Sequence, residues 1–139
     1  MSEQLLNDRD IEFLLYEFLD TEALLQRPRY SEHSREVFNA TLDTAKAIAG
    51  KYFADHYAKG DANEPTFDGE TVSQIEETRT AWNAFSEAGF LATQYDFDEG
   101  GMQLPEVVMR TAMSHFNAAN VSTAAYPFLT LGAANLVHS

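Results

Sequence analysis

Hydrophobic side chains recur along most of this chain at the spacing of an α-helix. The first such run consists of Ile11, Leu14, Leu15, Phe18 and Leu19. These positions share one face of a helix, so we expect that face to be buried. Asn7 or Asp8 is placed to cap the helix, because a short polar side chain accepts hydrogen bonds from the free amides of the first turn. Pro28 ends the segment, since the residue before a proline avoids the helical conformation.

A second helix is expected to begin near Ser31 or Ser34, either of which is a good N-cap, and to end near Gly60. Its helical stripe consists of Val37, Thr41, Leu42, Ala45, Ile48, Ala49, Tyr52 and Phe53. The long stripe predicts a helix that packs one face against the rest of the molecule.

A loop and a third helix are expected next. Residues 61–71 are rich in turn-forming residues and predict a loop. The helix is predicted over 72–88, and Gly89 follows it as a residue free to take a positive φ. The side chains expected to be buried are Ile75, Trp82 and Phe85. No segment of the sequence shows the convincing alternation of a β-strand.

The last third predicts two more helices. Pro105 opens the first of them, at a position where its missing N–H costs nothing. Its expected buried face is Val107, Val108, Thr111, Ala112, His115 and Phe116. Small polar residues at 117–120 predict a bend or break. Pro127 lies within the final apolar segment, 121–137, and costs about 3 kcal/mol inside a regular helix, so we expect a kink or a helix start near it.

Together these elements predict an all-α protein, a bundle of about five helices. The final segment runs to Ser139 with neither a capping glycine nor a polar tail. We therefore expect the sequence to be a piece of a longer protein, and a natural C-terminal helix is the alternative.

Composition excludes several classes of partner. Among 139 residues, 22 are acidic and 9 are basic, which gives a formal net charge of −13. Nucleic acids and anionic membrane surfaces bind basic faces, so neither is an expected partner. No run approaches the roughly 20 apolar residues that a membrane span needs. The start of the sequence resembles neither a secretory signal nor a transit peptide, so we expect a cytoplasmic location.

The sequence contains no recognisable catalytic or metal-binding motif. Cysteine is absent, which excludes thiolate nucleophiles, disulfides and thiolate zinc sites. The four histidines are scattered with no pair four residues apart, so no metal site is expected. His115 lies on an apolar helix face and is expected to be a hydrogen-bonded core residue. Glycine motifs that cradle phosphates and the nucleophile-turn motif are also missing.

Four hydroxyl-bearing side chains stand out in the last apolar segment. They are Ser122, Thr123, Tyr126 and Thr130. A mostly apolar face with a few orienting polar groups is typical of a ligand pocket. The alternative is ordinary packing, in which each hydroxyl bonds a carbonyl one turn back, and the residues taken alone favour that alternative.

Several runs of residues give the chain a resemblance to a known family. The run Ala-Gly-Phe-Leu at 88–91, followed by Glu-Gly-Gly-Met-Gln-Leu-Pro at 99–105, resembles a connection in the N-terminal helical domain of acyl-CoA dehydrogenases. The run at 120–134 is similar to the last helix of that domain. Residues 9–17 resemble an extra helix of a longer subgroup, which includes 3-methylmercaptopropionyl-CoA dehydrogenases. The resemblance covers nearly the whole chain.

The resemblance implies a fold, a domain division and a reaction. The fold is the orthogonal, up-down helical bundle of that N-terminal domain, over 31–139, preceded by a helical extension over 1–30. The reaction is α,β-dehydrogenation of an acyl-CoA thioester, with hydride passing to FAD. In the family, most FAD contacts and the catalytic glutamate lie in a middle β-domain and a C-terminal helical bundle. No catalytic, cofactor-binding or metal-binding residue is therefore assigned in this chain.

The resemblance also implies a role for the hydroxyl-bearing face. The residues that match the acyl-chain wall of the family are Ser122, Thr123, Tyr126 and Thr130. The implied partners are the acyl-CoA substrate, the missing domains and further copies of the parent protein in a homo-oligomer. The alternative is a stand-alone helical module that binds a partner protein through its apolar faces without catalysis. The chain departs from the family at His115, where many relatives carry a carboxylate, and in the unusually acidic loop at 96–99.

Overall fold

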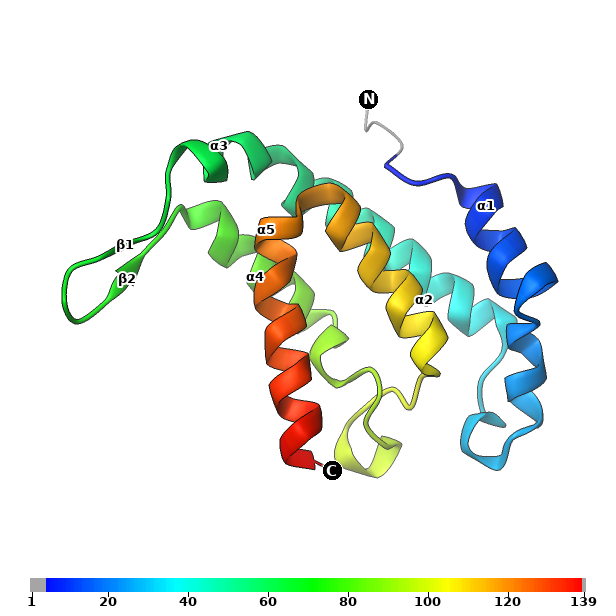
Figure 1. The fold of residues 1–139 in the computed structure, drawn as a ribbon. Helices are drawn as coiled ribbons and strands as arrows, with labels where there is room; N and C mark the ends of the chain where they lie inside the picture. Colours follow the sequence, from blue (N-terminus) through cyan, green and yellow to red (C-terminus); the bar gives the residue numbers. More distant parts are fainter. Residues whose placement is uncertain (1–4, 139) are drawn as a thin grey trace.

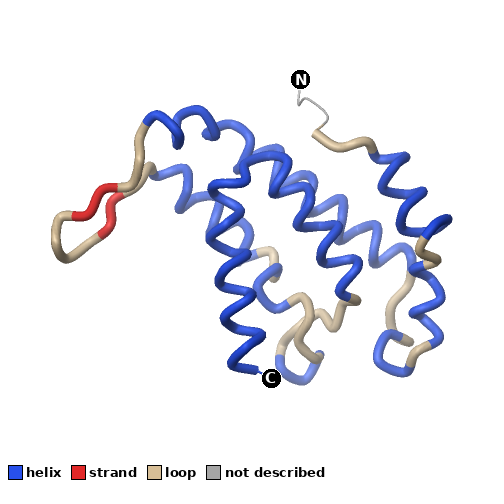
Figure 2. Tube along the Cα trace, in the orientation of Figure 1, coloured by secondary structure: helices blue, strands red, loops and turns tan. Residues whose placement is uncertain are grey.

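The computed structural model describes residues 5–138, and this range is built almost entirely from helices (Figures 1 and 2). The α-helices are α1 (Asp8–Glu12), α2 (Arg35–Ile48), α3 (Tyr57–Ala62), α4 (Glu76–Glu87) and α5 (Glu106–His138). Shorter 3-10 or π-helical pieces are η1 (Phe13–Phe18), η2 (Thr21–Gln26), η3 (Pro28–Tyr30), η4 (Ala49–Phe53), η5 (Ala54–His56), η6 (Phe90–Ala92) and η7 (Phe97–Glu99). The predicted all-α bundle is confirmed. None of the helices within residues 5–138 combines the length and the hydrophobicity that a membrane span requires.

An unexpected feature is a small hairpin that projects from the helical body (Figure 2). Strands β1 (Thr66–Phe67) and β2 (Val72–Ser73) pair in antiparallel register. The hairpin occupies the predicted loop and the start of the predicted third helix, so α4 begins at Glu76 and not at residue 72. The predicted start of the third helix at residue 72 is therefore wrong. No sign of the hairpin is visible in the sequence, because strands of two residues are too short to show an alternating pattern.

Helix α5 consists of two helices joined at Asn120. This residue has an extended backbone, with φ −164° and ψ 91°, between the proximal half (106–119) and the distal half (121–138). Its side-chain oxygen accepts a hydrogen bond from the Thr123 amide at 3.0 Å, as an N-cap residue does. The two halves run in opposite directions in Figure 1. The break predicted at 117–120 is confirmed, whereas Pro127 lies inside the distal half and does not mark its start.

Four phenylalanine rings form the centre of the core. The ring of Phe116 in the proximal half lies 5.0 Å from that of Phe53, 4.9 Å from that of Phe85 and 5.3 Å from that of Phe90, centroid to centroid. All four side chains are buried. Such ring pairs contribute about 0.5–1.5 kcal/mol each beyond the burial of area. Because the rings come from η4, α4, η6 and α5, they join segments that are far apart in the sequence.

The N-terminal helix differs from its prediction. Asn7 caps it as expected, accepting from two first-turn amides at 2.9 and 3.3 Å. After α1 the chain continues as the π-helix η1, whose wider turn moves the apolar positions out of line. Leu15 is buried, but Leu14, Phe18 and Leu19 are 49%, 70% and 53% exposed. The prediction that this whole run is buried is therefore wrong.

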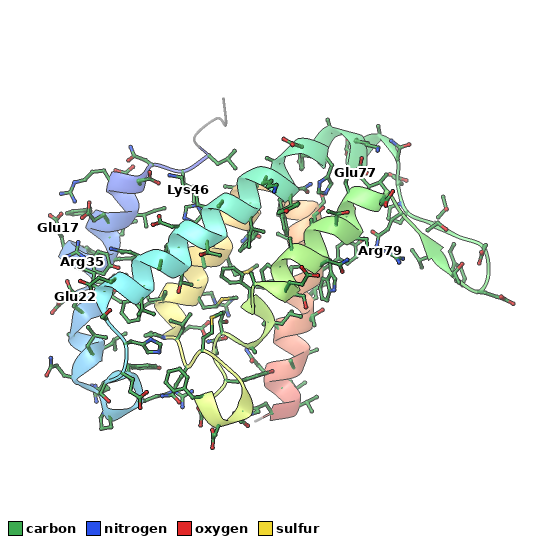
Figure 3. The ribbon with its side chains drawn as sticks, turned by 180° about the vertical axis from the view of Figure 1, so that it is seen from behind. Glu17, Glu22, Arg35, Lys46, Glu77 and Arg79 are labelled. Atoms are coloured by element: carbon green, nitrogen blue, oxygen red, sulfur yellow. The ribbon has the colours of Figure 1, made fainter. Side chains whose placement is uncertain are left out.

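Charged contacts orient the N-terminal segment against α2 (Figure 3). Arg35 of α2 lies 3.0 Å from a carboxylate oxygen of Glu12 and 3.2 Å from one of Glu22. Its guanidinium also lies 3.9 Å from the centroid of the Tyr16 ring. Exposed ion pairs of this kind contribute little to stability.

The remaining local predictions concern helix ends and buried faces. Ser34 caps α2, as predicted, and accepts from the Val37 amide at 3.3 Å. Gly89 takes the predicted positive φ, +84°. Phe85 is buried as expected, and Trp82 is partly buried.

Candidate functional site

The hydroxyl-bearing residues predicted from the sequence lie on different sides of the distal half of α5. Ser122, Tyr126 and Thr130 are exposed, whereas Thr123 is 5% exposed and faces the interior. The Thr130 hydroxyl donates to the Tyr126 carbonyl one turn back, at 2.9 Å, which is the packing alternative considered above. The structure brings Ser122, Thr123 and Tyr126 to one cavity and leaves Thr130 outside it.

This cavity, of about 220 Å³, lies between the distal half of α5, α3 and the base of the hairpin, and we call it the hairpin-base cavity. Its other lining residues are Tyr57, Gly60, Asp61, Asn63, Glu64, Pro65, Gln74, Ile75, Thr78 and Asn120. Polar and apolar surface contribute about equally to the lining, which includes two carboxylates. The cavity therefore suits a group that has both a polar and an apolar part.

A buried polar network, which the sequence reasoning missed, lies behind the hairpin-base cavity. His56 is 3% exposed, and its Nε2 lies 2.8 Å from the Thr123 hydroxyl. Asn120 donates from its side-chain nitrogen to the Phe53 carbonyl at 3.1 Å. A threonine hydroxyl both donates and accepts, so the contact with His56 is satisfied in either tautomer of the imidazole. The spacing of Asn120 and Thr123 is a readable capping signal, but His56 lies 67 positions from Thr123 and carries no such local signal.

An apolar groove borders the same distal half on another flank. It has a volume of about 340 Å³ and lies between the two halves of α5, and we call it the interhelix groove. Its apolar lining consists of Met109, Met113, Phe128, Leu129, Leu131, Gly132, Ala133 and Leu136. Arg110 lies over the Phe128 ring, 5.9 Å from its centroid. This groove has the chemistry that an alkyl chain requires.

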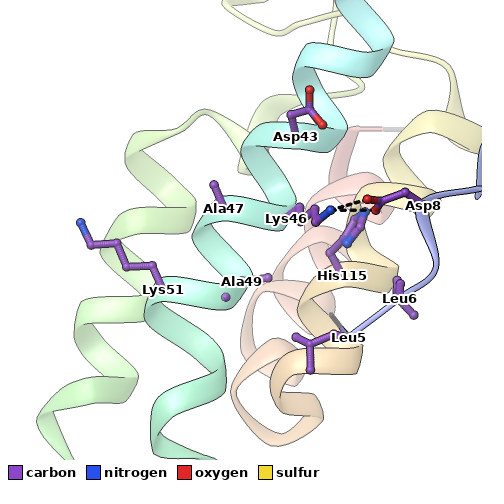
Figure 4. Close-up of a pocket in the computed structure, with 10 residues that line it drawn as sticks. Leu5, Leu6, Asp8, Asp43, Lys46, Ala47, Ala49, Lys51 and His115 are labelled. Carbon is purple, nitrogen blue, oxygen red and sulfur yellow. Dashed lines mark hydrogen bonds and ion pairs between the residues drawn. The ribbon is translucent and has the colours of Figure 1, made fainter. Parts of the chain in front are cut away.

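A larger hollow, of about 590 Å³, lies between the N-terminal segment, α2 and α5 (Figure 4). Lys46 donates to both carboxylate oxygens of Asp8 there, at 2.8 and 2.6 Å.

His115 lines the hollow and is buried, as predicted. The hydrogen bond predicted for its ring has no counterpart among residues 5–138. In the same range, no group of three or more His, Asp or Glu side chains is placed to hold a metal ion.

Two buried histidines determine the expected response to acid. Burial lowers the pKa of His56 below its ordinary value of 6.5, against an opposing effect of the nearby Glu77 carboxylate. Burial also lowers the pKa of His115, and the Lys46 ammonium adds to that effect. At pH values below 6.5, the ordinary pKa of histidine, the folded chain therefore binds fewer protons than the unfolded chain. The contribution of these two histidines to the free energy of unfolding is fully present above pH 6.5 and is lost as the pH falls.

We expect the free energy of unfolding to decrease from about pH 6.5 downward, before most carboxylates begin to take up protons. Urea denaturation at a series of pH values measures this free energy. The His115→Phe variant should show a shallower dependence on pH, because it removes one of the two groups. A midpoint that stays constant between about pH 5 and pH 8 would contradict the expectation.

Comparison with known proteins finds similarity between this chain and two acyl-CoA dehydrogenases. It matches no protein-family profile. It is 30% identical over 122 residues to the broad-specificity linear acyl-CoA dehydrogenase FadE5 of Mycobacterium tuberculosis, an alignment covering 86% of this chain and 20% of that protein. It is 28% identical over 125 residues to the 3-methylmercaptopropionyl-CoA dehydrogenase of Ruegeria pomeroyi, covering 90% of this chain and 21% of that protein. The chain thus spans about a fifth of the length of these curated relatives, and the resemblance found in the sequence is confirmed.

Proposed function

We propose that this chain is the N-terminal helical domain of an FAD-dependent acyl-CoA dehydrogenase. The proposal rests on the relation of the chain to the N-terminal part of acyl-CoA dehydrogenases. Its role there is to form part of the wall around the acyl chain and to pack against the other domains. FAD and the catalytic base belong to regions outside this chain, a middle β-domain and a C-terminal helical bundle. The reaction is the α,β-dehydrogenation of an acyl-CoA thioester.

The observation that carries the proposal is the exposed apolar surface of the distal half of α5. Phe128 and Leu129 are 47% and 67% exposed, although the opposite side of this helix is packed into the core. Exposed apolar surface of this kind marks a contact with a ligand or another protein. A wall of such residues keeps water from an alkyl chain, and each methylene buried against it contributes about 0.8 kcal/mol.

The four hydroxyl-bearing residues take different parts in the proposed wall. Ser122 and Tyr126 point outward and are proposed to face the acyl group. Thr123 is proposed to support them from behind, since its hydroxyl contacts His56. Thr130 lies one turn beyond Tyr126 on the exposed side, and its hydroxyl is already bonded to the helix backbone.

The test uses the complete protein that the gene encodes. It is purified with added FAD, and its reduction of an artificial electron acceptor is followed with straight-chain acyl-CoA substrates of increasing length. We expect flavin absorbance in the purified protein and turnover that depends on chain length. A complete protein that holds no flavin and gives no turnover would overturn the proposal and favour the stand-alone interaction module.

Within this proposal, Tyr126 limits the size of the acyl group. We expect Tyr126→Ala to raise kcat/KM for longer or branched acyl groups by about tenfold relative to short ones, because room for two more methylenes is worth about 1.6 kcal/mol. Steady-state kinetics across a series of acyl lengths measures the shift. Phe67→Ala, on the projecting hairpin, is the matched control and should leave the length preference as it is. Relative kcat/KM values that Tyr126→Ala does not change would refute the assignment.

A further inference from the structure

The distal half of α5 is attached to one segment of the chain, the end of η4 and η5, by directional polar contacts. Asn120 donates to the Phe53 carbonyl at 3.1 Å. The hydroxyl of Thr123 lies 2.8 Å from Nε2 of His56. The same Asn120 side chain accepts from the Thr123 amide at 3.0 Å. The first turn of the distal half is thus held by side chains that meet at residues 53–56.

These contacts bear on the rotation of the distal half about its own axis. Successive residues of an α-helix are separated by about 100°. The inward side consists of Asn120, Thr123, Ala124 and Pro127, all buried. Ala124 and Pro127 pack without side-chain hydrogen bonds, and apolar packing is non-directional. Apart from the hydrogen bonds of Asn120, the directional contact on the inward side, among the described residues, is therefore the one between His56 and Thr123.

The outward side depends on the same rotation. Ser122 and Tyr126 are exposed while Thr123, between them in the sequence, is buried. A rotation by one residue would turn one of the two outward side chains toward the core and bring a different one to the surface. The identity of the side chains that face an acyl group therefore follows from where Thr123 is held.

We infer that His56 is a positioning residue: by bonding Thr123 it holds the rotation of residues 121–138, and so selects the side chains that the proposed acyl wall presents. The consequence for substrates rests on the proposed function, whereas the effect on the helix does not. Because the His56 side chain is buried behind the helix, we assign it no contact with the substrate.

The surroundings of His56 agree with a neutral bridging role. Glu77 of α4 and Asp55 next to it favour the protonated ring, Lys59 of α3 disfavours it, and burial outweighs them, so the pKa of His56 is lowered. Glu77 is itself paired with Lys59. From α5, the group that meets the ring is the uncharged hydroxyl of Thr123. An uncharged imidazole can bridge here without the cost of burying a charge.

Two pairs of variants of the complete protein test the inference. His56→Leu and Thr123→Val each remove the contact, and Thr123→Val does so with almost no change in volume. His56→Gln and Thr123→Ser are their matched controls, because each keeps a group able to make the hydrogen bond. Two quantities are measured: KM and kcat across acyl-CoA substrates of increasing length, and hydrogen–deuterium exchange of the amides at 121–126.

We expect the two disrupting variants to raise KM for the preferred acyl length roughly fivefold, as loss of one hydrogen bond would, while kcat changes less than KM. The dependence on acyl length should flatten, and amides 121–126 should exchange faster. The two controls should restore both properties. If His56→Leu does not fold, Thr123→Val provides the same comparison.

Two results would overturn the inference. One is unchanged exchange at 121–126 in folded Thr123→Val protein. The other is a fall in kcat that is equal for all acyl lengths and is accompanied by a lower unfolding temperature, since this indicates a purely structural role. If the complete protein shows no dehydrogenase activity, the proposed function fails by itself, and the exchange comparison still decides whether His56 positions the helix.

Discussion

Replacing Phe116 by alanine is expected to lower the free energy of unfolding by about 4 kcal/mol, which is in the range found for buried phenylalanines. The ring of Phe116 lies within 5.3 Å, centroid to centroid, of three other buried rings. Its removal leaves a cavity where η4, α4, η6 and α5 meet, and no single neighbouring segment is free to close it. Urea denaturation followed by circular dichroism measures the loss.

The matched control for this prediction is Phe67→Ala, because Phe67 is on the projecting hairpin and largely exposed. We expect that variant to change the free energy of unfolding by no more than about 0.5 kcal/mol. Equal losses in the two variants would show that the cluster of four rings is not the centre of stability.

Gly101→Ala is expected to destabilise the chain by about 3 kcal/mol, because a methyl group at this position meets backbone atoms that cannot rotate away. Its Cβ would lie 2.1 Å from the Tyr95 carbonyl oxygen and 2.7 Å from that of Ala92. To relieve this clash, the loop must open at the hydrogen bonds that close it, including that from the Leu104 amide to the Thr93 carbonyl at 2.8 Å. Thermal denaturation of the variant measures the effect.

A glycine with open space around it is the control for this substitution. Gly132 lies in the distal half of α5, and a Cβ there would meet nothing within 4 Å. Gly132→Ala should therefore raise stability by about 0.5–1 kcal/mol, since alanine has less conformational freedom to lose in a helix. A loss in Gly132→Ala that equals the loss in Gly101→Ala would mean that close backbone approach is not the cause.

The structure gives a role to two of the three acidic residues of the loop at 96–99. Asp96 and Glu99 form a capping box around η7. Asp96 also pairs with Arg29, and Glu99 lies 2.9 Å from Nε2 of His138. The loop therefore joins the N-terminal segment to the end of the distal half of α5. These contacts span dozens of residues, so the charge pattern alone could not reveal them.

The predictions that succeeded depend on residues close together in the chain. The caps at Asn7 and Ser34, the positive φ at Gly89 and the break before residue 121 each arise from a few neighbouring residues. The physical cause is local, because a cap or a left-handed residue satisfies backbone groups within one turn. The family resemblance was also readable, since it rests on the order of such local runs.

The site was predicted less completely. The sequence placed four hydroxyl groups on one helical segment, but the structure divides them between an exposed side, a cavity and a buried network. Helical spacing reports which residues share a face, and it does not report what lies opposite that face. Thr123 faces His56 because two segments 67 positions apart pack together, and no pattern in either segment contains that information.

Sequence alone was sufficient for the helical class, for several helix caps and for the relation to acyl-CoA dehydrogenases, because propensities, caps and motifs act over short distances along the chain. Packing in three dimensions was needed to show that the first apolar run is largely exposed, that His56 lies behind Thr123 and that Gly101 has no room for a side chain. Each of these depends on which distant segments meet, and burial and directional hydrogen bonds arise only once they have met.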